Sequence, residues 1–228
     1  MGKNDNGNNG RTELVFVVDR SGSMGGLESD AIGVFNSMLS KQRTIAGECR
    51  VTTLLFDHRI ETLHNHLDIR EVNDLTSRDY WVRGSTALLD AIGLAIDRMI
   101  VTQRHTAAAY RAQHVLFVII TDGYENASRR YSLHQIKQMI TYERERYHWE
   151  FVFLGANIDA EQTAGDFGIS PRCATDFHAD GQGIKASFEA VACAATAVRG
   201  GADLEDLNAP DFLGGVRDDY RSRRRMKR

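Results

Sequence analysis

The sequence predicts an α/β fold, with an open, mostly parallel sheet, helices on both faces and one antiparallel edge strand. Short apolar runs recur along the 228 residues, separated by segments whose apolar residues return every three or four positions. Strands that alternate with helices favour parallel neighbours, because a parallel connection needs a crossover, which is usually a helix. Two of the runs are only two residues apart, which predicts a single antiparallel hairpin.

The predicted strands are short apolar runs bounded by polar turns, and they cover residues 13–18, 50–56, 59–64, 114–120, 149–154 and 172–177. The predicted helices are amphipathic, and they cover residues 27 to about 46, 86 to about 99, 132–147, 160–167 and 183–198. The run over 114–120 is the most hydrophobic, so we expect that strand at the centre of the sheet. Ser132 and Gln135 have the spacing of a capping box, which predicts a helix start there.

The composition indicates an ordinary globular protein, because 42% of the residues are hydrophobic and 26% are charged. The Asn/Gly-rich residues 1–11 predict a disordered leader. This leader has no apolar core like that of a secretory signal, and no run approaches the roughly 20 apolar residues of a membrane span. The 3 cysteines are odd in number and widely spaced, which argues against a disulfide framework or a zinc cage. We therefore expect a cytoplasmic protein with no membrane partner.

The charge is distributed unevenly along the chain. Residues 217–228 hold seven Lys and Arg against Asp218 and Asp219, a balance of +5, so the rest of the chain carries -8 of the formal net charge of -3. A basic tail of this kind can contact nucleic acid, an acidic partner or the protein itself, and it can also simply be solvated. Nucleic acid is not the partner that we expect.

Three polar turns carry the chemistry that the sequence suggests. Asp19, Ser21 and Ser23 follow the first predicted strand. Thr86 lies in the turn of residues 84–87, where a predicted helix begins, and Asp122 follows the predicted central strand. Ligands of open α/β sheets bind outside the carboxyl ends of the strands, near the point where the strand order reverses. These five oxygen-bearing side chains are ligands that a hard metal ion prefers. The alternative is that they form turns and cap helices.

The motif Asp19-x-Ser21-x-Ser23, with Thr86 and Asp122, resembles the metal-ion-dependent adhesion site of von Willebrand factor type A (VWA) domains. The resemblance implies a Rossmann-like domain that holds Mg²⁺, or Mn²⁺ in some circumstances. It also implies that the two serines bind the ion directly and that the two aspartates act largely through bound water. It further implies that the threonine binds the ion directly or through water, according to the state of the domain.

The likeness covers about residues 12–199, which we take as the VWA domain, and residues 200–228 form a C-terminal extension with the basic tail. It implies a binding module without catalysis, in which an Asp or Glu of a protein partner completes the coordination of the metal. A shift of the closing helix, residues 183–198, is coupled to this binding in some members. The chain looks closest to intracellular microbial members, which often work beside AAA+ ATPases or in multiprotein assemblies.

Two other functions remain open from the sequence. Asp19 also lies where a metal-dependent phosphohydrolase could carry its phosphate-accepting aspartate, although Ser21 replaces a second carboxylate and no base is placed by motif. Alternatively, residues 221–228 act on nucleic acid, with the domain as their scaffold. His64 and His66 could form a transition-metal pair or lie on a solvated edge strand.

Overall fold

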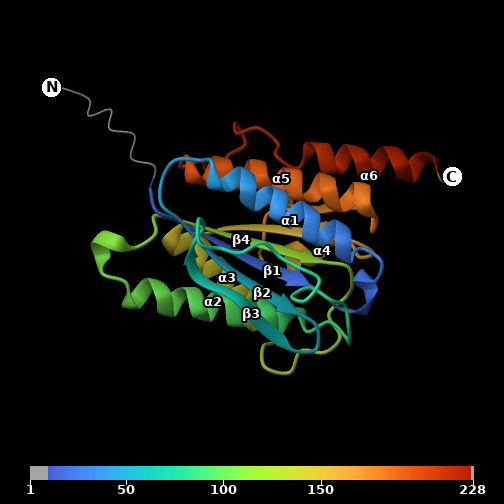
Figure 1. Ribbon diagram of the computed structural model, residues 1–228, viewed down its shortest axis with the longest axis horizontal. Helices are drawn as coiled ribbons and strands as arrows, with labels where there is room; N and C mark the ends of the chain where they lie inside the picture. Colours follow the sequence, from blue (N-terminus) through green and yellow to red (C-terminus); the bar gives the residue numbers. More distant parts are fainter. Residues whose placement is uncertain (1–9, 227–228) are drawn as a thin grey trace.

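The computed structural model describes residues 10–226, which form a six-stranded sheet between layers of helices (Figure 1). The strand order is β3-β2-β1-β4-β5-β6, and every neighbouring pair is parallel except β2 and β3. The strands are β1 (Thr12–Asp19), β2 (Cys49–Phe56), β3 (Ile60–Asp68), β4 (His114–Thr121), β5 (Glu150–Gly155) and β6 (Ala174–Asp176). The predicted fold class is confirmed. Most of the predicted leader, residues 1–9, lies outside the described residues.

The helices cover both faces of the sheet. They are α1 (Glu28–Arg43), α2 (Leu88–His105), α3 (Leu133–Tyr147), α4 (Ala160–Asp166), α5 (Gly181–Arg199) and α6 (Gly214–Met226). In Figure 1, α1, α5 and α6 lie on one side of the sheet, and α2 and α3 lie on the other. Within the described part of the chain, no helix combines the length and apolar character that a bilayer crossing needs.

The burial of each strand follows its place in the sheet. Every residue of β1 is buried, and so is every residue of β4 after His114, because each strand has a parallel neighbour on both sides. The edge strand β3 instead mixes buried, half-buried and exposed positions. The prediction that 114–120 is a central strand is confirmed, and so is the antiparallel hairpin at the edge.

Three element boundaries differ from the sequence-based expectation. Helix α1 ends at Arg43, four residues before Gly47, and α2 begins at Leu88 rather than at Thr86. The last strand has only three residues, because the segment Pro171–Cys173 before it forms a 3-10 turn. The capping box at Ser132 is present in full, with reciprocal hydrogen bonds between Ser132 and Gln135.

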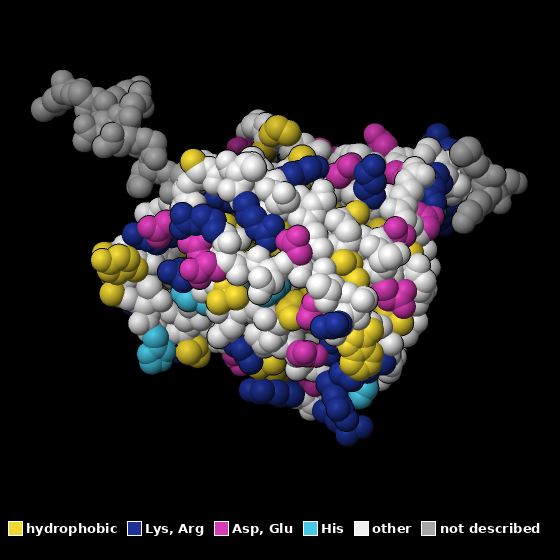
Figure 2. All heavy atoms as spheres, viewed as in Figure 1, with side chains coloured by type: hydrophobic (Ala, Val, Ile, Leu, Met, Phe, Trp, Pro, Cys, Tyr) yellow, Lys and Arg dark blue, Asp and Glu magenta, His cyan; other side chains and the backbone are white. Residues whose placement is uncertain are grey.

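Helix α6 is an element that the sequence-based reading missed, because its polar and basic residues resemble a solvated tail. It packs against α5 and β6. Arg223 pairs with Asp180 at the start of α5 and with Asp219, while Arg217 pairs with Asp211. Figure 2 shows acidic and basic side chains interspersed on the face of the molecule that carries α1, α5 and α6. Part of the basic extension is therefore paired with the protein's own carboxylates.

Buried contacts hold α5 against α1. Phe35 of α1 packs edge-on against Phe16 of β1 and Phe188 of α5, with ring centroids 5.3 and 6.2 Å apart. Arg199, which is 2% exposed, donates to the backbone carbonyl of Gln42 at 2.6 Å and to that of Ile45 at 2.8 Å, which lie at and just beyond the last turn of α1. The arginine thus satisfies carbonyls that the end of a helix leaves free.

Candidate metal centre

The candidate site lies where the strand order reverses. The chain passes from β1 outward to β2 and β3 and then returns to β4 on the other side of β1, so the crevice between β1 and β4 is the switch point of the sheet. Val18 is paired with Ile120 in the parallel register. Asp19 and Asp122, which follow these residues, therefore emerge at the same edge of the sheet.

Asp19 is completely buried, and both of its carboxylate oxygens have partners. Oδ1 accepts the backbone N–H of Ser21 at 2.6 Å, and Oδ2 accepts the hydroxyl of Thr121 at 2.6 Å. The amide of Asp122 lies 3.4 Å from the same Oδ2. These contacts fix the carboxylate between the first and the third polar turn.

The three hydroxyl groups converge on one point next to Asp19. The hydroxyls of Ser21 and Ser23 are 3.0 Å apart. A Cβ placed on Gly123 would lie 3.4 Å from Ser23 Oγ and 3.6 Å from Thr86 Oγ1. Both hydroxyls therefore border the space that the absence of a side chain at Gly123 leaves open. Ser21 and Thr86 are buried whereas Ser23 is exposed, so the site reaches solvent beside Ser23.

Asp122 supplies the second carboxylate. Its Oδ1 accepts a hydrogen bond from the side-chain amide of Asn157, and its Oδ2 is buried with no hydrogen-bond partner among the described residues. A buried carboxylate oxygen without a donor is costly, because it has lost water and gained nothing in return. A cation at this position would satisfy it.

Burial perturbs the protonation of both carboxylates. Burial raises the pKa of Asp122 to about 6, opposed by the hydrogen bond from Asn157 and increased by the nearby charge of Asp19. Burial also raises the pKa of Asp19, while the hydrogen bonds from Thr121 and Ser21 lower it. A bound divalent cation would reverse this balance, since a metal ion is the largest local charge in such a site.

The five predicted ligands thus lie together, and their chemistry fits a hard divalent cation. Three hydroxyls and two carboxylates offer only oxygen atoms as ligands. Mg²⁺ and Mn²⁺ prefer oxygen ligands, whereas softer metal ions prefer nitrogen or sulfur. In the described part of the chain there is no cluster of three or more His, Cys, Asp and Glu side chains, so a site here depends on the hydroxyl groups. The role of each residue as a ligand stays a prediction.

The alternative role as helix caps does not account for these residues. Ser21 precedes the 3-10 turn Gly22–Met24 and Leu27 precedes α1, and the structure shows no side-chain capping bond at either position. Helix α2 is preceded by Ala87, also without a side-chain cap. Of the five residues, Asp19 alone has a turn-forming role of this kind, because its side chain accepts the amide of Ser21 two residues later.

Several residues that support the site were missing from the sequence-based candidate list. Thr121 and Asn157 bond the two aspartates directly. The side-chain carbonyl of Asn126 accepts the amide of Thr86 at 2.9 Å, and Glu125 accepts the amide of Leu89 at 2.9 Å. The segment after Asp122 therefore shapes the site. The sequence did contain one signal for Asn157, because it lies just after the end of a predicted strand, where ligand-binding residues of this kind of sheet occur.

The two histidines of the edge strand differ in exposure, because His64 is buried whereas the side chain of His66 is 31% exposed. His64 is 5% exposed, and its Nδ1 lies 3.0 Å from the hydroxyl of Thr53. His66 has a left-handed backbone and lies 2.8 Å from the buried carboxylate of Glu13. The interpretation as a solvated edge strand therefore holds for His66 but not for His64, which lies opposite Thr53 at an irregularity in the β2–β3 pairing.

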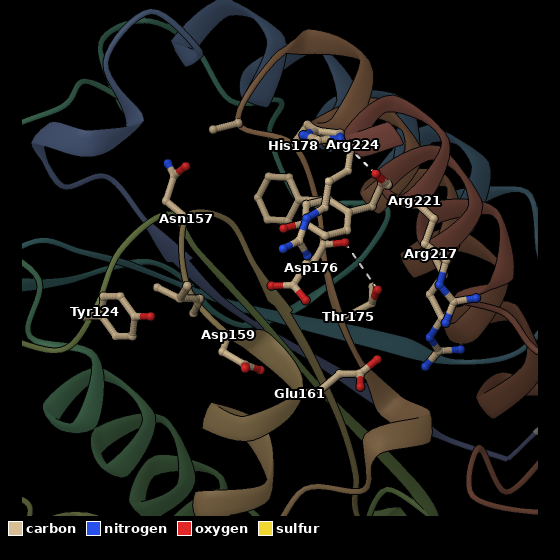
Figure 3. A pocket seen from close by; sticks show the side chains of 14 residues that line it. Tyr124, Asn157, Asp159, Glu161, Thr175, Asp176, His178, Arg217, Arg221 and Arg224 are labelled. Atoms are coloured by element: carbon tan, nitrogen blue, oxygen red, sulfur yellow. Dashed lines mark hydrogen bonds between the residues drawn. The ribbon is translucent and has the colours of Figure 1, made fainter. Parts of the chain in front are cut away.

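A polar cavity of about 660 Å³ begins beside Asn157 (Figure 3). In the figure, Asn157 and Tyr124 lie on one side of this cavity and Arg217 lies on the other, with Glu161 between them at the bottom of the view. The cavity therefore extends the sheet edge from the candidate metal centre toward α6.

Comparison with solved structures relates this edge to a known kind of site. The structure of proximal thread matrix protein 1 from the mussel byssus, described as having a zinc-occupied MIDAS motif, matches 82% of this chain with a TM-score of 0.57 and 15% sequence identity. MIDAS denotes the metal-ion-dependent adhesion site. This chain has the von Willebrand factor type A fold.

A second VWA match supports the same fold. The pilus adhesin SpaC from Lactobacillus rhamnosus GG, in an open conformation, matches 82% of this chain with a TM-score of 0.61 and 11% identity. This chain spans 46% of the mussel protein and 30% of SpaC, so it corresponds to one part of each. No protein-family profile and no curated protein matches the sequence.

Proposed function

We propose that this VWA domain is a metal-dependent protein-binding module, which holds a divalent cation and uses it to capture a carboxylate of a partner protein. The observation that carries the proposal is the convergence of three hydroxyls and two buried carboxylates from three separate segments. One carboxylate oxygen is buried and has no hydrogen-bond partner in the part of the chain that the structure describes. The zinc-occupied MIDAS motif of the mussel protein supports a divalent ion at this edge of the fold.

The residue types suggest how such a module works. Ser21, Ser23 and Thr86 would offer neutral oxygens to the ion, and Asp19 and Asp122 would hold its water ligands. Mg²⁺, or Mn²⁺, would supply an electrophilic position that an Asp or Glu of the partner completes. Because neutral hydroxyls leave much of the charge of the ion uncompensated, the ion favours an additional anionic ligand.

The surroundings of Asp19 favour binding over phosphoryl transfer. A phosphate-accepting aspartate needs an accessible oxygen, whereas Asp19 is fully buried and both oxygens are occupied by Ser21 and Thr121. We therefore assign no catalytic residue and propose capture without turnover. A cytoplasmic location remains part of this proposal.

Calorimetry on metal-free protein tests the metal site. We expect Mg²⁺ or Mn²⁺ to bind the unmodified protein and to bind Asp19→Ala at least tenfold more weakly, while the control Glu145→Ala, on the exposed face of α3, binds as the unmodified protein does. Equal binding by Asp19→Ala and the unmodified protein would discredit the site.

A pull-down with and without EDTA at constant ionic strength tests the partner. Proteins captured through the ion should be lost with EDTA and with Asp122→Ala. Contacts of the basic α6 with nucleic acid should instead weaken steeply with salt and survive the chelator. If every captured protein survives both EDTA and the substitution, the binding function is wrong.

A further inference from the structure

Asp57 is a fully buried carboxylate just beyond the end of β2, next to the candidate metal centre but outside it. Its Oδ2 accepts hydrogen bonds from Arg20 Nε at 3.2 Å and from Arg83 Nε at 2.8 Å. Its Oδ1 accepts the amide of Arg59 at 2.8 Å and lies 2.9 Å from His58 Nδ1. Although burial acts against it, these hydrogen bonds and charges lower the pKa of Asp57, so the group is ionised at neutral pH.

The two arginines belong to the two hydroxyl-bearing loops. Arg20 lies between Asp19 and Ser21 in the first motif, and Arg83 lies three residues before Thr86. One carboxylate oxygen thus joins the loop that carries the serines to the loop that carries the threonine.

The backbone around Asp57 repeats the connection. The carbonyl of Asp57 accepts the amide of Ala87, directly after Thr86, at 2.9 Å. The carbonyl of Arg20 accepts the amide of Arg83 at 2.9 Å, and the amide of Gly22 donates to Gly84 at 3.2 Å. Asp57 therefore lies at the centre of a small buried network that fixes the separation of the two loops.

We propose that Asp57 is a positioning residue for the metal centre: by tying Arg20 and Arg83 together, it holds the hydroxyls of Ser21, Ser23 and Thr86 at a common point. The proposal rests on the proposed function, since it concerns affinity for the ion of that site. Groups that orient ligands without touching a metal commonly change its affinity by about tenfold to a hundredfold when they are removed.

Glu61 provides the matched control. It also pairs with Arg20, at 2.7 Å, but its side chain is 54% exposed and it has no hydrogen bond to the loop of Thr86 within the described structure. Removing it takes a charge from the same arginine without separating the two loops. An effect of lost charge alone would appear in both variants, whereas an effect of positioning would appear only at Asp57.

The experiment measures Mn²⁺ affinity by electron paramagnetic resonance of the free ion, at a temperature where circular dichroism shows each variant to be folded. We expect Asp57→Ala to bind Mn²⁺ at least tenfold more weakly, Arg83→Gln at least threefold more weakly, and Glu61→Gln within twofold of the unmodified protein. Asp57→Asn, which retains an acceptor oxygen, should recover part of the loss.

Hydrogen exchange in the metal-free protein gives a readout that does not depend on the ion. The amides of Arg83 and Ala87 should exchange faster in Asp57→Ala, while those of the central strand β4 should not. A general loss of stability would accelerate both sets.

Three outcomes would overturn the proposal. One is Mn²⁺ binding of unmodified strength in folded Asp57→Ala; if that variant does not fold, the same result in Arg83→Gln decides. Another is an equal loss in Glu61→Gln. The third is that the unmodified protein itself binds no Mn²⁺, which would remove the proposed function together with this inference, whereas either of the first two removes the inference alone.

Discussion

Replacing Asp122 by Asn should make the metal-free protein more stable at neutral pH while removing its response to metal. In the absence of a cation, Asp122 is a buried carboxylate beside Asp19 whose Oδ2 has no donor among the described residues. Burial raises its pKa from 3.8 to about 6. The folded state therefore binds the proton more tightly than the unfolded chain does, and stability falls as the pH rises from about 4 to about 6.

The magnitude follows from that shift. A change in pKa from 3.8 to about 6 corresponds to about 3 kcal/mol of destabilisation by the ionised form above pH 6. The Asn side chain can keep its oxygen toward Asn157, but its NH₂ then lies where Oδ2 has no partner. Because an unpaired buried donor also costs about 1–3 kcal/mol, we expect a net gain of about 1 kcal/mol at pH 8 in EDTA.

Mg²⁺ should invert the order of the two proteins. At a hundred times its dissociation constant, a ligand that binds only the folded state adds about 2.7 kcal/mol, which the unmodified protein should gain and Asp122→Asn should not. Urea unfolding of both proteins at pH 5 and pH 8, in EDTA and in Mg²⁺, measures each difference. A lower stability of Asp122→Asn in EDTA at pH 8, or equal stabilisation of both proteins by Mg²⁺, would contradict an unpaired, metal-binding carboxylate at position 122.

Three further changes test other parts of the structure. Burial raises the pKa of Glu150 to about 7, so ionisation of this carboxyl destabilises the folded protein increasingly as the pH rises from about 4.5 to about 7. In urea unfolding, Glu150→Gln should therefore be about 2 kcal/mol more stable than the unmodified protein at pH 8 and equally stable at pH 4. Ser132→Ala removes the capping box of α3 and should cost about 1 kcal/mol in the same assay. Among the three cysteines, the exposed Cys193 alone should react rapidly with a thiol reagent, because Cys49 and Cys173 are buried and burial raises the pKa of each of these two thiols to about 12. Thiol titration of the folded and then the unfolded protein measures this, and rapid reaction of more than one thiol in the folded protein would contradict it.

Most of the fold could be predicted from the sequence because its signals are local. The strand β4 is a continuous apolar run, and the start of α3 is marked by Ser132 and Gln135. Prediction failed where local signals compete. The segment before β6 forms a 3-10 turn at Pro171. Helix α6 buries Val216 and forms ion pairs such as that of Arg223 with Asp180, but its mostly polar and basic sequence offers no extended apolar pattern that would reveal it.

The candidate ligands could be predicted for a related reason, since each one directly follows a strand or precedes a helix. The residues that hold them could not, because their roles depend on which strands are neighbours. Asn157 reaches Asp122 only because β5 lies next to β4, and Asp57 reaches Arg20 only because β2 lies next to β1. Strand order is a property of the whole sheet, and no short segment carries it.

Arg20 shows why this second set matters for the chemistry of the site. It lies between Asp19 and Ser21 in the sequence, and a guanidinium placed against Asp19 would neutralise that carboxylate and compete with a cation. In the structure, the guanidinium instead pairs with Asp57 and Glu61 of the neighbouring hairpin. The arginine thus balances the charge of the hairpin, and the negative charge of the two aspartates remains available to a metal ion. The same pairing that separates Arg20 from Asp19 also ties together the loops that carry the hydroxyls, so charge and geometry at the site depend on one buried carboxylate.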